Sequence, residues 1–565
     1  MDQEIKKCQN CKQDFIIEPE DFDFYKKIKV PPPTWCPTCR MRRRMSFLND
    51  RNFYRRKCDL TGESCVSVFP QDALVPVYSP KAWWSDDWDA IEYGQDYEFT
   101  IPFFEQFARL MRRVPQFSLQ SQYSTLINSD YTMMGTYNKN CFMVVNTQYS
   151  DDCIYTTFCS NSKSCMDVYM CHDSELCFQS INLKKCSRVV YSEDCENSFN
   201  IAFSKNLKNC NNCFGCFNLR NKSYCIFNKQ YIKEEYVKEI EKYKTDSYAQ
   251  VIKLMQKFID MDKEYPKQFM EGSQNKDVTG NYLYESKNSY YCFDSVGVED
   301  SKYCQFCHLK PTQDSYDMTF WGGNARFIYE CMGAGGGQNN IKFSIDAWSV
   351  ASNIEYSYHI VAPNNDLFGC IGLRNKQYCI LNKQYYKEEY EELIPKIKKH
   401  MDEMPYIDKK GRVYKYGEFF PSEISFFGYN ETLAYSYLPL SKEEAENMGL
   451  KWKEIATNKH EITKKSSELP DRIIDVDESI TKDIIEEESS GRAYQVTASE
   501  LRLLKQLNVP LPRKHPNERH YDRVKRRNPM KLWERTTEDG VKVMTSFSPD
   551  RPEKIYSKEG FERML

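Results

Sequence analysis

A strict twelve-residue interval constrains the fold of this chain more than any other feature. Small or aliphatic residues occupy every twelfth position over 84 residues, and a second series marks the half-interval. The first series is Cys141, Cys153, Cys165, Cys177, Val189, Ile201, Cys213 and Cys225, and the second is Cys159, Cys171, Leu183, Cys195, Leu207 and Leu219. Asn, Ser and Asp are common between them, as in tight turns. The spacing predicts a narrow β-solenoid, with two short strands per coil around a ladder of stacked side chains.

This array recurs as a block. The segment at 214–236 matches the segment at 368–390 in 18 of 23 positions, and Cys292 and Cys304 repeat the twelve-residue step. We therefore predict a second solenoid, in which the glycine-rich run GAGGG at 333–337 forms a bulge. A charged, aromatic-bearing helix is predicted after each array, at about 232–265 and 386–403, where it would cover strand edges that otherwise lack partners.

Four cysteines near the start have the spacing of two zinc knuckles. They form the pairs Cys8-x2-Cys11 and Cys36-x2-Cys39. Each CxxC turn lets two thiolates reach one ion, and four thiolates complete a tetrahedral shell with no position left for a catalytic water. The pattern predicts one structural zinc per chain. Cys58 and Cys65, which follow, are assigned no ligand role.

The same segment recurs near the other end without its cysteines. Shifted by 479 positions and without gaps, residues 8–58 align with 487–537. The four predicted ligands then correspond to Glu487, Ser490, His515 and Glu518. A mixed set with one hydroxyl is a poor zinc site, so the second copy is predicted to be metal-free. Shared prolines and arginines at one fixed offset indicate internal duplication.

The N-terminal segment CQNCKQDFIIEPEDFDFYKKIKVPPPTWCPTCRMRRR resembles the probable zinc-ribbon domain found in many uncharacterised bacterial proteins. The resemblance covers about the first 45 residues and lies in the CxxC pair and the closing CPxCRxxRR. It implies a zinc ribbon with Cys8, Cys11, Cys36 and Cys39 as ligands. It implies no activity.

The chain is too long for one compact core, so we expect a mainly β, modular protein. The expected parts are a zinc ribbon with its extension (1–95), the first solenoid (96–230), a helical cap (231–270), the second solenoid (271–384), a second cap with a YGEFFP segment (385–455), a polar linker (456–486) and the degenerate ribbon (487–565).

Arginines follow the last knuckle of both copies, and they suggest a nucleic-acid contact. The candidates are Arg40, Arg42, Arg43, Arg44, Arg519, Arg523, Arg526 and Arg527. A positive patch with interleaved aromatic rings suits phosphate contact and base stacking. The competing interpretation is a solvated face or internal pairing with acidic segments. A net charge of −3 restricts any such binding to a local region.

Enzymatic motifs are weak by comparison. Solenoids can carry polysaccharide-cleaving sites, and the candidate carboxylates here are Asp151, Asp152, Asp173 and Asp194. Solvated turns account for these residues more simply. The preferred hypothesis is a non-enzymatic scaffold whose partner is an unknown protein or RNA, with an RNA- or ribosome-binding protein and a solenoid enzyme as alternatives.

The compartment follows from the cysteines and from hydropathy. The sequence contains no run of about 18 apolar residues that could span a membrane, and its start carries no recognisable export signal. In such a chain, 24 cysteines are expected to be metal ligands and buried thiols rather than disulfides. A cytoplasmic protein is therefore predicted.

Overall fold

The computed structural model describes residues 2–348, 350–361, 363–454 and 461–565. The chain is mainly β, with about 31% of residues in strands, in agreement with the predicted class. Most strands lie in two long stacks of short coils. We call residues 127–230 the first stack and residues 272–384 the second stack. Residues 8–58 and 487–537 are called the N-terminal module and the C-terminal module.

In the first stack, the parallel pairs join residues twelve positions apart. Val145 pairs with Thr157, and Thr157 pairs with Tyr169. One wall consists of β7 (Thr132–Met133), β8 (Val144–Gln148), β9 (Thr157–Ser160), β10 (Tyr169–His172), β11 (Ile181–Lys184) and β13 (Glu193–Glu196). Another consists of β12 (Ser187–Val190), β14 (Phe199–Ala202), β15 (Asn211–Phe214), β16 (Ser223–Ile226) and β17 (Lys229–Gln230). The interior holds the cysteines and aliphatic residues of the twelve-residue series.

Left-handed backbone turns shape each coil. A residue with positive φ occurs at every third position from Met134 to Phe227. Each twelve-residue coil therefore has four corners and four short sides, which is more angular than the predicted pair of strands. Asn and Asp occupy many corners because their short polar side chains tolerate left-handed φ and ψ angles.

The second stack is less regular. Its strands are β19 (Gly272–Ser273), β20 (Lys276–Tyr284), β21 (Lys287–Val296), β22 (Val298–Glu299), β23 (Thr312–Gln313), β24 (Tyr316–Gly322), β25 (Ala325–Gly335), β26 (Asn339–Lys342), β27 (Ile345–Trp348), β28 (Ala351–Glu355), β29 (Tyr358–Ile360), β30 (Asn364–Phe368), β31 (Gln377–Ile380) and β32 (Lys383–Gln384). Val298 pairs with Thr312 and Thr312 pairs with Ala325, so these coils are slightly longer than those of the first stack.

The extra residues are thus spread over several coils. GAGGG does not form the predicted bulge, because Gly333, Ala334 and Gly335 belong to β25. Gly333 has a left-handed φ of 71°, and a Cβ there would lie 2.5 Å from Asp346 Oδ1, so glycine suits this position.

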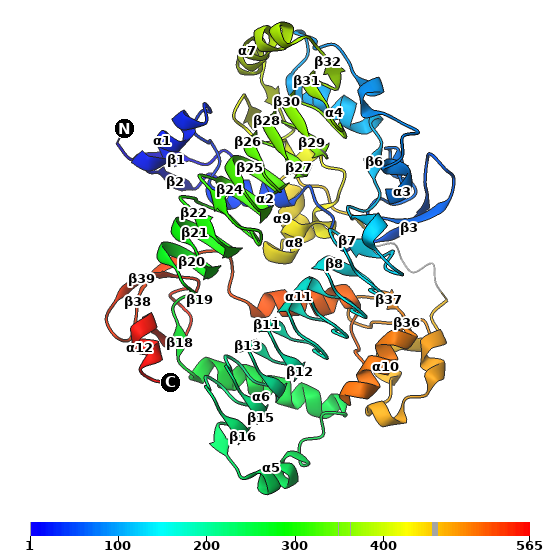
Figure 1. Cartoon of the computed structure of the whole chain (residues 1–565), viewed down its shortest axis with the longest axis vertical. Helices are drawn as coiled ribbons and strands as arrows, with labels where there is room; N and C mark the ends of the chain where they lie inside the picture. The colour runs from blue at the N-terminus through cyan, green and yellow to red at the C-terminus, as the bar shows by residue number, and fades with distance from the viewer. Residues whose placement is uncertain (1, 349, 362, 455–460) are drawn as a thin grey trace.

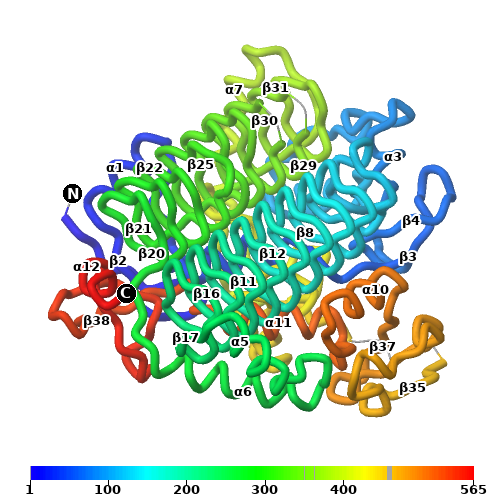
Figure 2. The backbone as a smooth tube through the Cα atoms, turned by 60° about the horizontal axis from the view of Figure 1, so that its bottom comes forward, coloured from blue at the N-terminus to red at the C-terminus, as the bar shows by residue number. Residues whose placement is uncertain are grey.

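The two stacks lie side by side and run in opposite directions along the chain (Figure 1). Figure 2 shows their coils as two adjacent rows. Aromatic rings join them: Phe158 of the first stack lies on Phe306 of the second, with ring centroids 4.9 Å apart, and also contacts Phe320. One apolar cluster therefore contains residues from both stacks.

Each stack ends in the same way. An antiparallel hairpin closes the last coil, formed by β16 with β17 or by β31 with β32. A helix follows, α5 (Lys233–Ile240) or α7 (Lys387–Glu403). A tyrosine of this helix packs against a tyrosine of the last parallel strand, β16 or β31. The ring pairs are Tyr224 with Tyr236 and Tyr378 with Tyr390.

The helix predicted at 232–265 is in fact two helices. Ser247 starts α6 (Tyr248–Glu264), where its side chain accepts a hydrogen bond from the Gln250 amide. α5 has already ended at Ile240, and the N-cap at Ser247 starts a new helix after the intervening turns. α6 then crosses the last coils of the first stack, with Phe258 stacked on Phe217 (Figure 1).

The polar linker predicted at 456–486 is packed over the part that the structure describes, and residues 456–460 lie outside the described residues. Residues 461–486 form short 3-10 turns whose apolar side chains lie against the first stack and α6. Leu469, Ile473, Val476 and Ile480 are buried there. These apolar residues at short intervals were the signal against a linker.

No helix in the described part of the chain is both long enough and apolar enough to cross a bilayer. All 24 cysteines are free thiols in this structure.

Candidate metal centre and its duplicate

A hairpin and a helix bring the four predicted ligands together. β1 (Glu4–Lys7) and β2 (Asp14–Ile17) pair antiparallel, and the turn between them holds Cys8 and Cys11. α1 (Pro19–Lys27) follows, and α2 (Pro37–Met45) then begins directly after Cys36 and carries Cys39 in its first turn. Pro37 at the first helical position fixes φ where no amide donor is needed.

The four sulfur atoms all lie within 4.8 Å of one another. Cys8 and Cys39 are buried, while Cys11 and Cys36 are half-buried. Two further donors point at the sulfurs: the Cys36 amide lies 3.2 Å from Cys8 Sγ, and Asn10 Nδ2 lies 3.2 Å from Cys39 Sγ. N–H donors of this kind stabilise metal-bound thiolates. The cluster can hold a metal ion, and four cysteine sulfurs are a donor set that suits zinc.

The thiols influence one another's protonation. Hydrogen bonds from Cys36 and Cys39 lower the pKa of Cys8, whereas contact with Cys39 and Cys8 raises the pKa of Cys36. Four thiolates this close together would repel one another without a cation. A bound divalent ion would remove this conflict by compensating the negative charge.

The C-terminal module repeats these elements at the offset found in the sequence. α11 (Pro516–Arg526) begins at the proline that aligns with the start of α2, and α10 (Ala498–Leu507) begins at the residue that aligns with the start of α1. The hairpin strands are β36 (Ile485–Glu486) and β37 (Ala493–Tyr494). A further hairpin follows each second helix: β3 (Tyr54–Lys57) with β4 (Ser64–Ser67), and β38 (Trp533–Thr536) with β39 (Lys542–Thr545).

Hydrogen bonds replace the cysteine cluster in this second copy. Glu487 Oε2 accepts from the His515 amide at 2.8 Å, the bond that Cys8 Sγ accepts from Cys36 in the first copy. Ser490 Oγ donates to the same carboxylate at 3.0 Å, and Glu518 pairs with Arg492 at 3.4 Å. Burial and the nearby Arg492 charge lower the pKa of His515 well below its usual range. Glu487, Ser490 and the His515 backbone therefore bind one another, whereas Glu518 binds Arg492.

The arginines after the first knuckle pair lie inside the protein. Arg40 Nη2 lies 2.7 Å from Asp317 Oδ2, and Arg44 Nη1 lies 2.9 Å from Asp317 Oδ1. Arg43 pairs with Glu330 and Glu418, each at 3.0 Å. The three arginine side chains are at most 1% exposed. We call Arg40, Arg44 and Asp317 the N-terminal clamp, because they fix α2 to the second stack.

The duplicate arginines form an equivalent clamp on the first stack. Arg519 Nη1 lies 2.7 Å from Asp167 Oδ2, and Arg523 Nη1 lies 3.0 Å from Asp167 Oδ1. We call these three residues the C-terminal clamp. Asp167 and Asp317 both lie at coil corners where the backbone is left-handed, with φ of 54° and 56°. In each clamp, arginines four positions apart on one helix face bind one buried carboxylate.

The remaining candidate arginines are also engaged. Arg526 pairs with Glu193 at 2.9 Å, Arg527 pairs with Asp294, and the half-buried Arg42 points Nη1 at Met448 Sδ. The candidate arginines therefore do not form the open basic surface that the sequence suggested. The reason is that acidic residues of the stacks and of the YGEFFP segment neutralise them. Sequence reasoning missed Asp167 and Asp317, although the arginine spacing recurs in both copies.

The YGEFFP segment is part of the same contact. Glu418 binds Arg43 and also accepts from the backbone and hydroxyl of Thr34. Gly417 has φ of 98°, and a Cβ there would lie 2.3 Å from Pro31. Glycine is therefore required at this position by the close approach to the proline-rich turn.

The carboxylates considered for polysaccharide cleavage do not converge. Each of Asp152, Asp173 and Asp194 accepts an amide hydrogen bond from the asparagine twelve positions earlier, at 3.1, 3.2 and 2.8 Å. The interval between successive members is not a whole number of coils, so each lies at a different corner. Asp151 is exposed at its turn. These residues do not provide the facing pair of carboxylates that hydrolysis needs.

The ladder thiols behave as small apolar residues with a weak donor. Cys177 Sγ donates to the carbonyl of Glu175 at 3.3 Å, and Cys195 Sγ donates to that of Glu193 at 3.4 Å. Burial raises the pKa of both thiols. Such thiols are poor nucleophiles because the thiolate is the reactive form.

Comparison of the chain with protein-family models and with curated proteins finds no match.

Proposed function

We propose that this protein is a non-enzymatic scaffold, in which a zinc ribbon and its metal-free duplicate hold two β-solenoids together and leave solenoid faces free to bind a partner protein. The four cysteine ligands would fill the tetrahedral shell of the zinc, so the ion would act in folding and not in catalysis.

The observation that carries this proposal is that each terminal module contacts both stacks. The N-terminal clamp fixes α2 to the second stack, while Phe53 of the same module packs on Tyr131 of the first stack, with ring centroids 6.4 Å apart. The C-terminal clamp fixes α11 to the first stack, while Arg527 of the same module pairs with Asp294 of the second stack. Each end of the chain is therefore tied to both stacks, which is typical of a rigid support.

The exposed corners of the first stack supply a surface for a partner. Tyr137 and Tyr149 stack with ring centroids 4.9 Å apart, and they are 51% and 55% exposed. Beside them, Asn128 donates to Asn140 and Asn140 donates to Asp152 along successive coils. Tyrosine next to adaptable amides is a common composition of protein interfaces.

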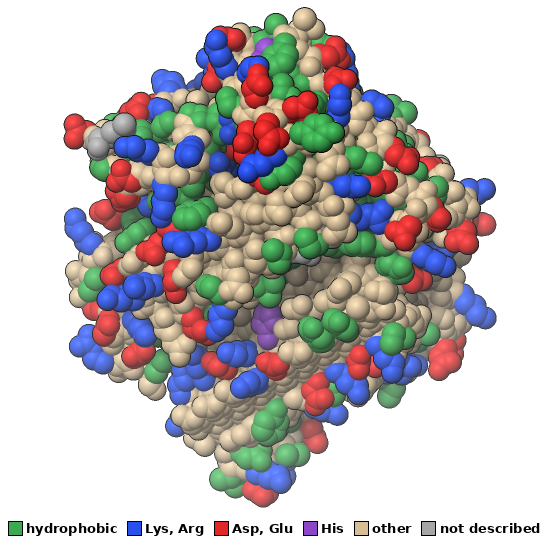
Figure 3. Space-filling model, turned by 45° about the horizontal axis from the view of Figure 1, so that its top comes forward, with side chains coloured by type: hydrophobic (Ala, Val, Ile, Leu, Met, Phe, Trp, Pro, Cys, Tyr) green, Lys and Arg blue, Asp and Glu red, His purple; other side chains and the backbone are tan. Residues whose placement is uncertain are grey.

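Charge favours a protein over RNA as the partner. The arginines that suggested RNA are held inside the protein, most of them in ion pairs, as described above. On the face drawn in Figure 3, Lys and Arg side chains are interspersed with Asp and Glu around a broad uncharged band. A surface of mixed sign gives little of the phosphate attraction that dominates nucleic-acid binding.

A pull-down from native cells with the tagged full-length protein tests this function. The double variant Tyr137→Asp with Tyr149→Asp should lose its partner, whereas Leu74→Asp, which changes a 93% exposed residue elsewhere, should retain it. Captured material that is sensitive to ribonuclease and dissociates at moderate salt would show an RNA-binding protein instead.

A further inference from the structure

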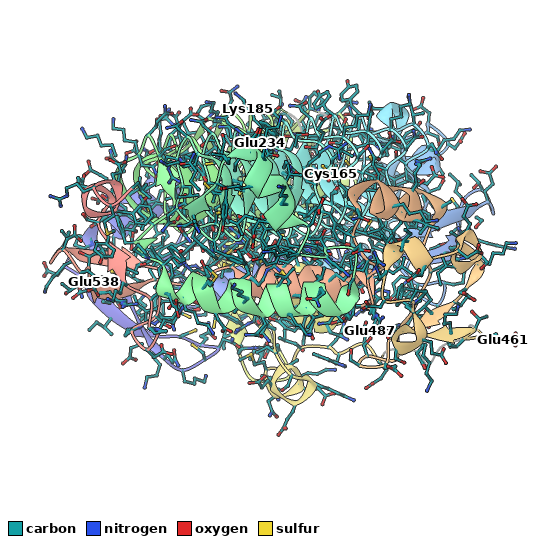
Figure 4. All side chains as sticks on the ribbon, turned by 90° about the horizontal axis from the view of Figure 1, so that it is seen from below. Cys165, Lys185, Glu234, Glu461, Glu487 and Glu538 are labelled. Atoms are coloured by element: carbon teal, nitrogen blue, oxygen red, sulfur yellow. The ribbon has the colours of Figure 1, made fainter. Side chains whose placement is uncertain are left out.

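A second group of sulfur atoms lies inside the first stack. In the described part of the chain, the Sγ atoms of Cys165, Cys171 and Cys177 lie within 4.8 Å of one another, as do those of the predicted zinc ligands. All three residues are 0% exposed. Figure 4 labels Cys165 over the coils of this stack and Lys185 at their outer edge.

The geometry of the coil explains why three sulfurs meet. Cys165 and Cys177 occupy the same position in successive coils, because Met166 donates its amide to the Cys177 carbonyl. Cys171 lies halfway between them in sequence, on β10, so its side chain enters the narrow interior from another wall. Ser162 Oγ is 4.0 Å from Cys171 Sγ.

Aliphatic residues follow the cluster at the next position of each of its two ladders. Along the wall of β10, Cys159 and Cys171 are in register and Leu183 is next. On the other ladder, Val189 follows Cys177 at the twelve-residue interval. The next coil therefore has aliphatic side chains at these two positions. Leucine and valine are thus the substitutions that should fit in place of the cysteines.

The donor set selects the kind of ion. Three sulfurs without oxygen or nitrogen ligands suit a soft ion, and zinc would still lack a fourth donor. Cu(I) accepts low-coordinate sulfur ligation. Charge favours the same choice: if one Cu(I) replaces one thiol proton, the net charge of the buried core is unchanged, so burial adds no uncompensated ion.

We propose that Cys165, Cys171 and Cys177 form a binding site for one Cu(I) ion inside the first stack, separate from the four-cysteine cluster of the N-terminal module. Binding forms copper–sulfur bonds to the three residues and releases one S–H proton to solvent. No electron is transferred, because the metal enters as Cu(I). The weak thiol bonds of Cys165 and Cys177 to backbone carbonyls, at 3.4 and 3.3 Å, are the interactions displaced.

Anaerobic titration of the zinc-loaded full-length protein with Cu(I), in competition with a chromophoric Cu(I) chelator, tests the site. We expect one tightly bound Cu(I) per chain, no release of zinc, and a sulfur-only shell in X-ray absorption. Cys171→Leu, which copies Leu183, should weaken this binding by at least ~100-fold.

Cys195→Leu is the matched control, because Cys195 is buried on the same wall two coils away from Cys171 and outside the cluster. It should leave copper binding unchanged. If Cys171→Leu does not fold, Cys165→Val, which copies Val189, replaces it. Copper uptake that matches zinc release, or that Cys171→Leu and Cys195→Leu reduce equally, would overturn the proposal.

Discussion

The N-terminal and C-terminal modules share one backbone plan but close it by different chemistry. In the first, four cysteine sulfurs meet within 4.8 Å. In the second, the Glu487 carboxylate accepts the equivalent amide and the Ser490 hydroxyl. The arginine clamp is retained in both, with Asp317 or Asp167 as the shared carboxylate.

The comparison shows which feature of the module is present in both copies and which is present in only one. A metal cluster can be replaced by a hydrogen-bond network, because both supply acceptors for the same backbone donors. A clamp cannot be lost as easily, since removal of one partner leaves a buried charge without compensation. We infer that a metal bound by the cysteine cluster would be a local brace and that the clamps fix the modules to the stacks.

Metal removal should produce the largest difference in stability between the two modules. Structural zinc in small domains contributes about 10 kcal/mol or more to folding. Chelation should therefore increase hydrogen exchange of the amides in residues 8–39 while leaving those of 487–518 protected. Equal loss of protection in the two modules would contradict independent closure and would show that the metal supports the whole molecule.

Substitution of the clamp aspartates should have the next largest effect, and an equal one in the two copies. Asp317→Asn leaves Arg40 and Arg44 without their shared carboxylate, and Asp167→Asn does the same to Arg519 and Arg523. Breaking a buried pair typically costs about 3–5 kcal/mol, which denaturant unfolding would measure.

Asp314→Asn is the control for this comparison. Asp314 pairs with Lys27 at 2.9 Å and with Arg326 at 2.8 Å, but these two basic side chains are 50% and 55% exposed. A solvent-screened pair is worth about 1 kcal/mol or less. If Asp317→Asn were as mild as this control, the clamps would not be the main attachment.

Glu487→Ala should have a smaller, local effect. The substitution removes the acceptor of the His515 amide and of Ser490 Oγ, and a buried donor without a partner costs about 1–3 kcal/mol. Hydrogen exchange at the His515 amide should increase, while zinc content stays unchanged. An unaffected His515 amide would mean that the network does not close the second copy.

Mild acid should also distinguish the modules. Burial lowers the pKa of His515 and of His520 well below 6.5, and residues 8–58 contain no histidine. A histidine with a lowered folded pKa stabilises the fold above the unfolded value, and this stability is lost as pH falls below about 6.5.

The expected slope is at most about 1.4 kcal/mol per pH unit and per histidine. His520→Met, which copies the equivalent Met41, should reduce the slope of stability between about pH 6.5 and 5.5. Fluorescence-monitored unfolding across this range measures it. A slope unchanged by His520→Met would exclude that histidine as a source.

Much of the design could be read from the sequence. The internal duplication predicted matching helices, and α2 and α11 begin at matching prolines. The CxxC spacing predicted the cysteine cluster. Periodicity identified the interior of the first stack, because small buried side chains recur once per coil.

Other features depend on contacts that a sequence does not encode locally. Asp317 is one of many acidic residues, and only the three-dimensional arrangement places it between Arg40 and Arg44. For the same reason the arginines resembled a basic surface. The break between α5 and α6 was missed because the polar pattern continues through it, although Ser247 can serve as the N-cap of a new helix.

Metal analysis of the purified full-length protein tests the central comparison most directly. Native mass spectrometry and elemental analysis should give one zinc per chain, no zinc in Cys36→Ser, and one zinc in Glu487→Ala. Two zinc ions per chain, or zinc retained in Cys36→Ser and lost in Glu487→Ala, would contradict the assignment of metal to the N-terminal module and of hydrogen bonds to its duplicate.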